Sequence, residues 1–194
     1  MNFSGEAYNV EMGVTNEVFP SERSESCQFN PTPEDHPDFE GGVSGVQHFT
    51  DFMRLIAPPQ AADATASTLR GQQVFVSIGC SLCHTPTLKT RGSDVEALSK
   101  QPVNLFSDLL LHDMGSGLAD RVSQGLATGN EFRTAPLWGA GQRLFFLHDG
   151  RTSDVKAAIL AHESTGSEAN AVIGLFKALP VFDQQHLLNF LRAL

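Results

Sequence analysis

The sequence predicts a mostly α-helical fold with an irregular N-terminal extension. Apolar residues recur at helical spacing in several segments, whereas no run alternates apolar and polar residues strongly enough to favour a β-strand, and no internal repeat is visible. A chain of 194 residues is long enough for one domain with an appendage and a sizeable core. We therefore expect an extension over residues 1–60 and a folded domain over residues 61–194.

The first part of the chain is expected to contain one helix. Residues 1–41 are rich in Ser, Glu, Asn and Pro and close with the run PTPEDHPDFEGG, which favours irregular structure. Apolar side chains then recur at helical spacing until Pro58 and Pro59 end the pattern. These apolar positions are Val46, Phe49, Met53 and Ile56. A polar linker rich in Ala and Thr follows.

Three helices are predicted in the second part of the chain. A short one covers residues 68–77, and another covers residues 152–162 and begins with Thr-Ser-Asp, residue types that commonly cap a helix. The last covers residues 182–194, where leucines form one apolar stripe. The stripe consists of Leu187, Leu188, Leu191 and Leu194.

The run Cys80-Ser81-Leu82-Cys83-His84 is the attachment pattern of a c-type haem. Each thiol adds to one haem vinyl group, and the histidine that follows places an imidazole nitrogen under the iron as the proximal ligand. The helix over residues 68–77 leads into this motif, and a haem domain expects it to cross the C-terminal helix. The sequence therefore predicts a cytochrome c-like domain with one haem c, bound covalently through Cys80 and Cys83.

Zinc binding and dithiol chemistry are the alternatives for the two cysteines. A structural zinc site usually needs four Cys or His ligands in two spaced pairs, and Cys27 is the only other cysteine. A thioredoxin-type pair usually follows a strand in a βαβ unit, and no such pattern is visible. Cys27 itself is expected to be a buried free thiol or the partner of a cysteine outside this chain.

A haem iron needs a sixth ligand, and His162 is the first candidate. Val155, Ala158, Ile159 and His162 lie at helical positions i, i+3, i+4 and i+7, which places the histidine on the buried face of the predicted helix over residues 152–162. A histidine at such a position is often only a hydrogen-bonded core residue. The haem iron nearby favours ligation instead.

Met114 is the main rival ligand, and His112 is a weaker one. A thioether ligand would raise the reduction potential, and Gly115 and Gly117 would let a loop approach the haem closely. His112 lies in the same loop, where a hydrogen bond to the backbone is the simpler explanation. The residues alone leave this choice open.

Charge and composition restrict the partners. The net charge of −9 and the isoelectric point of 5.1 argue against nucleic acid, which requires a basic surface. An acidic surface is compatible with a basic redox partner, although it more often only keeps a protein soluble. No apolar run is as long as a membrane span.

The start of the chain is unlike a signal peptide. The residues MNFSGEAYNV have neither the basic region nor the apolar core of one, whereas bacterial c-type haem is attached outside the cytoplasm. We therefore expect a periplasmic or otherwise extracytoplasmic protein whose export signal has been removed, or a fragment of a longer chain. We favour the fragment.

Several segments in order resemble the bacterial di-haem oxidoreductases, a family also labelled as peroxidases or thiol oxidoreductases and similar to the di-haem cytochrome c peroxidases. The resemblance runs from about Asn9, in VEMGVTNEVFP, to Leu194. It is carried by GQQVFVSIGCSLCHTPTL, NLFSDLLLHDMGSGLAD, EFRTAPLWGAG, FLHDGRTSDVKAAILAH and LLNFLRAL.

The resemblance implies a distal ligand. The peroxidases place the distal ligand of their C-terminal haem on the helix after a Phe-His-x-Gly turn, which corresponds to Leu147-His148-Asp149-Gly150 in this sequence. The equivalent ligand position is His162. The peroxidases usually have methionine there, so this chain departs from them. The resemblance implies bis-histidine ligation by His84 and His162 and a lower potential than that of a His/Met haem.

The resemblance also implies residues around the haem propionates. Arg133 matches an arginine that meets a propionate in the relatives, since a guanidinium suits a carboxylate, although a surface ion pair is the alternative. His148, and less strongly Arg151, are further candidates for such contacts. Trp138 is a core residue or packs at the edge of the haem.

Family members carry a second Cys-x-x-Cys-His motif in an N-terminal domain, and the peroxidase resemblance implies that peroxide chemistry takes place there. This chain contains one motif, and residues 1–60 resemble the remnant of a preceding haem domain. We therefore expect an electron-transfer domain that is not an active enzyme alone and that serves a redox partner protein or a second haem domain. The alternatives are a catalytic peroxidase-type domain whose distal ligand, His162 or Met114, dissociates to admit substrate, and a remnant that never receives haem.

Overall fold

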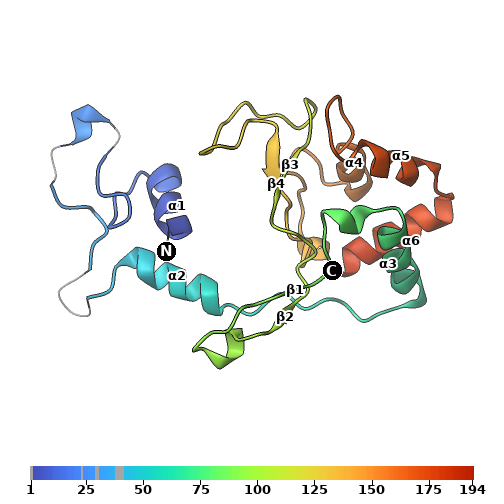
Figure 1. Cartoon of the computed structure of the whole chain (residues 1–194), viewed down its shortest axis with the longest axis horizontal. Coiled ribbons are helices and arrows are strands. Elements are labelled where there is room, and N and C mark those ends of the chain that lie inside the picture. Colours follow the sequence, from blue (N-terminus) through green and yellow to red (C-terminus); the bar gives the residue numbers. More distant parts are fainter. Residues whose placement is uncertain (1, 23, 29–30, 38–41) are drawn as a thin grey trace. The chain divides into compact units, whose positions relative to one another are not determined.

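The computed structural model describes residues 2–22, 24–28, 31–37 and 42–194, apart from the side chains of Asn2 and Cys27. The chain divides into two units, Met1–Pro58 and Pro59–Leu194 (Figure 1). In both units the regular structure is mainly helical, with long irregular segments between the helices, which is consistent with the mostly helical prediction. No helix among the described residues has the length and hydrophobicity to cross a membrane.

The first unit contains helices α1 (Asn2–Met12) and α2 (Gly45–Leu55), with a 3-10 turn at Glu25–Cys27. Helix α1 lies in a segment predicted to be irregular, so that prediction is wrong for these residues. Its sequence has no apolar stripe, and tertiary contacts hold it instead. The fully buried Asn16 donates a side-chain hydrogen bond to the Gly5 carbonyl (2.9 Å), and the Tyr8 ring packs on Phe49 of α2.

Helix α2 closely follows the prediction, and its first turn is well capped. The Ser44 hydroxyl accepts a hydrogen bond from the Gln47 N–H. Both carboxylate oxygens of Asp35 accept hydrogen bonds, at 2.7 Å each, from the N–H groups of Gly45 and Val46. A negative charge at this end also complements the helix dipole.

In the second unit, helix α3 (Ala66–Ser77) crosses the C-terminal helix α6 (Val181–Ala193), as the haem-domain prediction required (Figure 1). The two backbones nearly touch at Gly71, because a Cβ atom at this position would lie 2.0 Å from the carbonyl oxygen of His186 and 2.6 Å from the Cβ of Phe190. The core forms around this crossing. Its buried members are Val74, Phe75, Ile78, Phe106, Val155, Phe176, Leu187, Leu188, Phe190 and Leu191.

Two short antiparallel sheets were not predicted. Strand β1 (Leu88–Lys89) pairs with β2 (Pro102–Val103), and β3 (Leu111–Asp113) pairs with β4 (Glu131–Arg133). Strands of two or three residues are too short to show a recognisable apolar–polar alternation.

Helix α5 (Asn170–Ala178) was also missed, and helix α4 is shorter than expected. Helix α4 spans Val155–Leu160, and the Asp154 carboxylate caps its first turn. The helix was predicted to continue to His162. Instead, the His162 N–H donates to the carbonyl of Ile159, three residues back, so the chain leaves the α-helix in a tightened turn.

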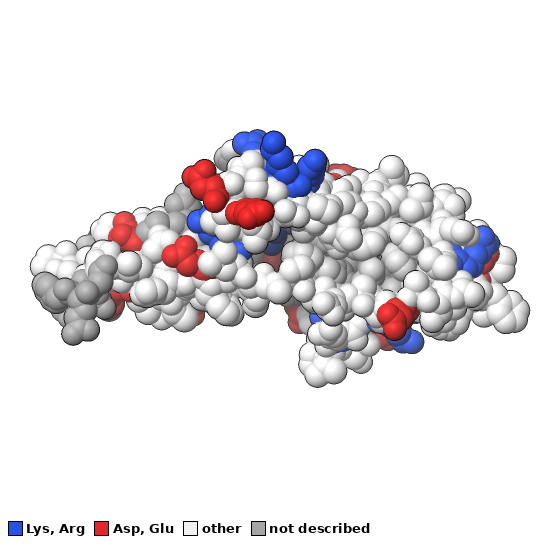
Figure 2. Space-filling view, turned by 90° about the horizontal axis from the view of Figure 1, so that it is seen from below, with Lys and Arg blue, Asp and Glu red and all other residues white. Residues whose placement is uncertain are grey.

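Lys and Arg side chains lie close to Asp and Glu side chains in small groups on the face drawn in Figure 2, and most of that face is uncharged. An ion pair joins the second unit's two crossing helices, since the Arg70 Nε donates to the Asp183 carboxylate at 2.9 Å. Both members are solvent-accessible, so the pair contributes little to stability.

Candidate haem site

The Cys-x-x-Cys-His segment forms one tight turn directly after helix α3. Gly79 ends the helix with a φ of 95°, a conformation that favours glycine, and Cys80–Leu82 then form a 3-10 turn. The His84 N–H donates to the Cys80 carbonyl at 3.0 Å, which closes the turn. Both thiols are free. The fold therefore presents two thiols and an imidazole from a single rigid turn.

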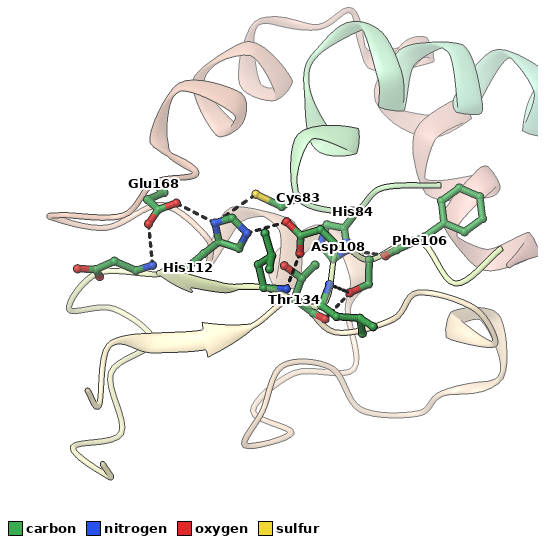
Figure 3. Close-up of polar contacts among 11 residues, drawn as sticks. Cys83, His84, Phe106, Asp108, His112, Thr134 and Glu168 are labelled. Atoms are coloured by element: carbon green, nitrogen blue, oxygen red, sulfur yellow. Dashed lines mark hydrogen bonds and ion pairs between the residues drawn. The ribbon is translucent and has the colours of Figure 1, made fainter. Parts of the chain in front are cut away.

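A hydrogen bond and an aromatic contact hold the His84 ring in one orientation. Its Nδ1 donates to the main-chain carbonyl of Phe106 at 3.0 Å (Figure 3), and its ring centroid lies 6.4 Å from that of the tilted Phe75 ring. Burial lowers the pKa of His84 to about 4, so the imidazole is neutral at pH 7. A neutral ring that donates from Nδ1 keeps the Nε2 lone pair available for a metal.

His162 is arranged in the same way. Its Nδ1 contacts the carbonyl oxygen of Ala158 at 2.8 Å, and burial lowers its pKa as well. His162 is close enough to His84 for a positive charge on it to be one of the smaller causes of the lowered pKa of His84, after burial. Within the described residues, neither Nε2 atom has a hydrogen-bond partner. The fold thus brings together two neutral imidazoles, each oriented by a backbone carbonyl.

These residues fit a covalently bound haem. Cys80 and Cys83 supply the two thiols of the attachment chemistry, and His84 and His162 supply two available Nε2 atoms. Three phenylalanines back the His84 side with ring centroids 5.4 to 6.0 Å apart. They are Phe75, Phe106 and Phe190. This apolar wall would exclude water from the proximal side.

The other residues predicted to contact the haem differ in whether their side chains already have partners within the protein. Arg133 is exposed at the end of β4, and its guanidinium has no hydrogen bond or ion pair within the described part of the chain. Its neighbour Phe132 stacks on the His148 ring at 4.4 Å. Arg151, in contrast, is occupied by the Asp149 carboxylate and the Gly117 carbonyl. Trp138 is partly buried.

The rival ligand Met114 has a fixed main chain. Its N–H donates to the Asn130 carbonyl at 2.9 Å, and its carbonyl accepts from the Ser164 hydroxyl at 3.0 Å. The side chain of Cys27 lies outside the part of the chain that the structure describes.

Sequence reasoning missed a hydrogen-bonded cluster beside Cys83. His112 Nδ1 donates to Glu168 (2.8 Å) and Nε2 donates to Asp108 (2.9 Å), while the Cys83 sulfur lies 3.7 Å from Nδ1 (Figure 3). Both ring nitrogens face carboxylates, which favours the protonated form of His112. The hydrogen bond to Glu168 is the largest cause of its raised pKa. No sequence signal links these residues, since Glu168 lies 56 positions after His112.

The thiols should be slow to react in the haem-free chain. Burial raises the pKa of Cys80 to about 12. The pKa of Cys83 is also raised, mainly by burial and to a smaller extent by the nearby Asp108 and Glu168 carboxylates. At pH 8, we expect alkylation of Cys80 to be roughly a hundredfold slower than in the urea-unfolded chain. Mass spectrometry of timed iodoacetamide reactions measures the alkylation rate of Cys80 in the folded chain and in the urea-unfolded chain. Equal rates would contradict this packing of Cys80.

The fold and the site define a class: a helical, haem-linked redox protein built around a Cys-x-x-Cys-His turn. The chain belongs to the di-haem oxidoreductase family, because the family described as "Di-haem oxidoreductase, putative peroxidase" matches residues 3–194. No curated protein and no solved structure matches this chain. The family name implies two haems, and these 194 residues contain one attachment motif.

Proposed function

We propose that this chain binds one haem c through Cys80 and Cys83, with His84 and His162 as axial ligands, and transfers electrons within a di-haem oxidoreductase system. The observation that carries this proposal is that the two histidines make the same kind of hydrogen bond. Each Nδ1 is bonded to a backbone carbonyl, and each Nε2 lacks a protein partner among the described residues.

The bound haem supplies a one-electron iron centre. The chain's own residues prepare the site for it. Phe106 and Ala158 orient the two imidazoles through their carbonyl groups, and the aromatic wall around Phe75 excludes water from the proximal side. Because two orienting hydrogen bonds hold the two ligands, the iron site is expected to stay six-coordinate in both oxidation states. Such a site suits electron transfer better than substrate binding.

The proposal favours His162 over Met114. His162 is close enough to His84 to influence its pKa and has an available nitrogen among the described residues. Arg133 and His148 would meet the propionates, since the Arg133 guanidinium has no protein partner in the described residues. The electron partner is a second haem domain or a separate redox protein. Because thioether attachment in bacteria takes place outside the cytoplasm, an extracytoplasmic location is part of the proposal.

His162→Ala tests the ligand assignment. We expect the resting ferric haem to change from low-spin to largely high-spin, because the iron loses one strong-field nitrogen. Optical and electron paramagnetic resonance spectra of the haem-loaded protein measure the change. His186→Ala is the matched control, since His186 lies on helix α6 of the same unit and its Nδ1 is hydrogen-bonded to the Ser67 hydroxyl, and its spectrum should stay low-spin.

Two results would overturn the proposal. An unchanged low-spin spectrum in His162→Ala would exclude His162 as the ligand and favour Met114. High-spin ferric haem in the unaltered protein, together with turnover of hydrogen peroxide, would support a catalytic peroxidase-type domain with a dissociating ligand in place of an electron carrier.

A further inference from the structure

The cluster beside Cys83 joins three segments that surround the proposed haem site. Asp108 belongs to the attachment side, because its N–H donates to the Cys83 carbonyl at 2.9 Å. His112 lies on strand β3. Glu168 lies in the loop that follows His162 and ends at helix α5. The chain of contacts Asp108–His112–Glu168 therefore runs from the attachment turn to the loop that carries the distal histidine (Figure 3).

The contact between β3 and this loop continues along the backbone. The Glu168 N–H donates to the Asp113 carbonyl (2.9 Å), and the Asp113 N–H donates back to the Glu168 carboxylate (3.0 Å). The Ser167 hydroxyl donates to the carbonyl of His162 at 2.6 Å. Displacement of Glu168 would thus be passed through Ser167 to the backbone of His162.

Close packing leaves this loop little freedom. Gly115 has a φ of 68°, and a Cβ atom there would lie 2.4 Å from the Ser164 hydroxyl and 2.6 Å from the Thr165 carbonyl oxygen. Two packed segments with several mutual hydrogen bonds separate as a unit or not at all. A shift of the His162 backbone away from β3 therefore requires this contact to open.

A metal ion is not needed to explain the cluster. Donor atoms of Cys83, Asp108 and His112 lie within 4.8 Å of one another, a spacing typical of metal ligands. The two carboxylates, however, bind opposite nitrogens of the His112 ring, so the ring joins them and does not share one ion with them. The Cys83 sulfur is also consumed when the thioether forms.

We infer that the Asp108–His112–Glu168 bridge fastens the loop carrying His162 to the haem-attachment turn and thereby slows dissociation of His162 from the iron. The inference rests on the proposed ligation by His162. Asp108 and His112 are mostly buried, with 14% and 18% of their side chains exposed, whereas the Glu168 side chain is 54% exposed. Glu168 is therefore a positioning residue that can be replaced without disturbing the core.

Cyanide binding to the ferric, haem-loaded protein measures the dissociation. At saturating cyanide, the observed rate of a six-coordinate haem is limited by release of its own ligand. We expect Glu168→Gln to raise this limiting rate by about threefold to tenfold, because a charge-assisted hydrogen bond is weakened at a partly exposed site. His112→Gln removes the central residue of the bridge and should raise the limiting rate of cyanide binding at least as much.

Glu163→Gln is the matched control. Glu163 lies in the same loop, but its carboxylate pairs with Lys177 of helix α5 and does not contact β3. The limiting rate of Glu163→Gln should stay within about twofold of that of the unaltered protein, because most exposed ion pairs contribute little to stability. Hydrogen exchange gives a second measurement: the Glu168 amide, which donates to Asp113, should exchange faster in His112→Gln than in Glu163→Gln.

The outcomes separate the two proposals. If His162→Ala binds cyanide no faster than the unaltered protein, His162 is not the ligand, and the proposed ligation fails together with this inference. If His162→Ala binds cyanide quickly while Glu168→Gln and His112→Gln do not differ from the Glu163→Gln control, only the bridge loses its role. Equal acceleration in Glu168→Gln, His112→Gln and Glu163→Gln would indicate general loosening and would also overturn the inference.

Discussion

Replacement of Gly71 by alanine is expected to destabilise the second unit by about 3 kcal/mol, the upper range for overpacking a tight contact. The added methyl group would lie 2.0 Å from the carbonyl oxygen of His186, a backbone atom that cannot rotate away. Helices α3 and α6 would have to separate, and the core around Phe75 and Leu187 would lose contacts on both sides. Equilibrium unfolding in urea, followed by circular dichroism, measures the loss.

Gly174→Ala is the control for this experiment. Gly174 lies within helix α5, and a Cβ atom there meets nothing within 4 Å. Because alanine forms helix better than glycine, this variant should be neutral or more stable by roughly 0.5 to 1 kcal/mol. If Gly71→Ala proves as stable as Gly174→Ala, the two helices do not approach as closely as described.

The double variant Cys80→Ala, Cys83→Ala is expected to lose all covalently bound haem. Both thioether bonds would be missing, so a haem that still entered the site could be held only by His84, His162 and packing. The readout is the mass of the denatured polypeptide after expression with the c-type maturation machinery. The unaltered chain should carry the mass of one haem, and the double variant should carry none.

Cys27→Ala is the matched control for thioether attachment, because Cys27 is the only cysteine outside the motif. It should retain the full haem mass. An unaltered chain that emerges from the maturation machinery without haem would support the remnant hypothesis and refute the proposed electron-transfer role. Single variants at Cys80 or Cys83 should retain haem through one thioether bond.

Several helices could be predicted from local sequence. Helices α2 and α6 follow apolar patterns with a helical period, and helix α3 was predicted as the segment that leads into the Cys-x-x-Cys-His motif. Helix α1 could not be predicted, because polar residues such as Asn16 hold it through tertiary hydrogen bonds and no apolar stripe marks it. The strand pairs also escape prediction, since their residues recognise each other only after the intervening loops have folded.

The position of His162 shows the limit of periodicity. Its spacing from Val155 correctly indicated a side chain turned toward buried surroundings, but the helix ends at Leu160 and the histidine occupies the turn beyond it. A helix end of this kind depends on hydrogen bonds such as that from Ser167 to the His162 carbonyl. Those bonds come from residues later in the chain, where no periodic pattern records them.

The sequence alone predicts the attachment chemistry, because two thiols and an imidazole within five consecutive residues need only one local turn to act together. Together with the motifs that follow it, that run was also enough to indicate the family. Only the tertiary structure decided which groups surround that turn: the carbonyl of Phe106 under His84, the ring of His162 near it, and the bridge from Asp108 to Glu168. These groups lie 22 or more positions after His84 in the sequence, and packing of the helices and loops brings them to the turn.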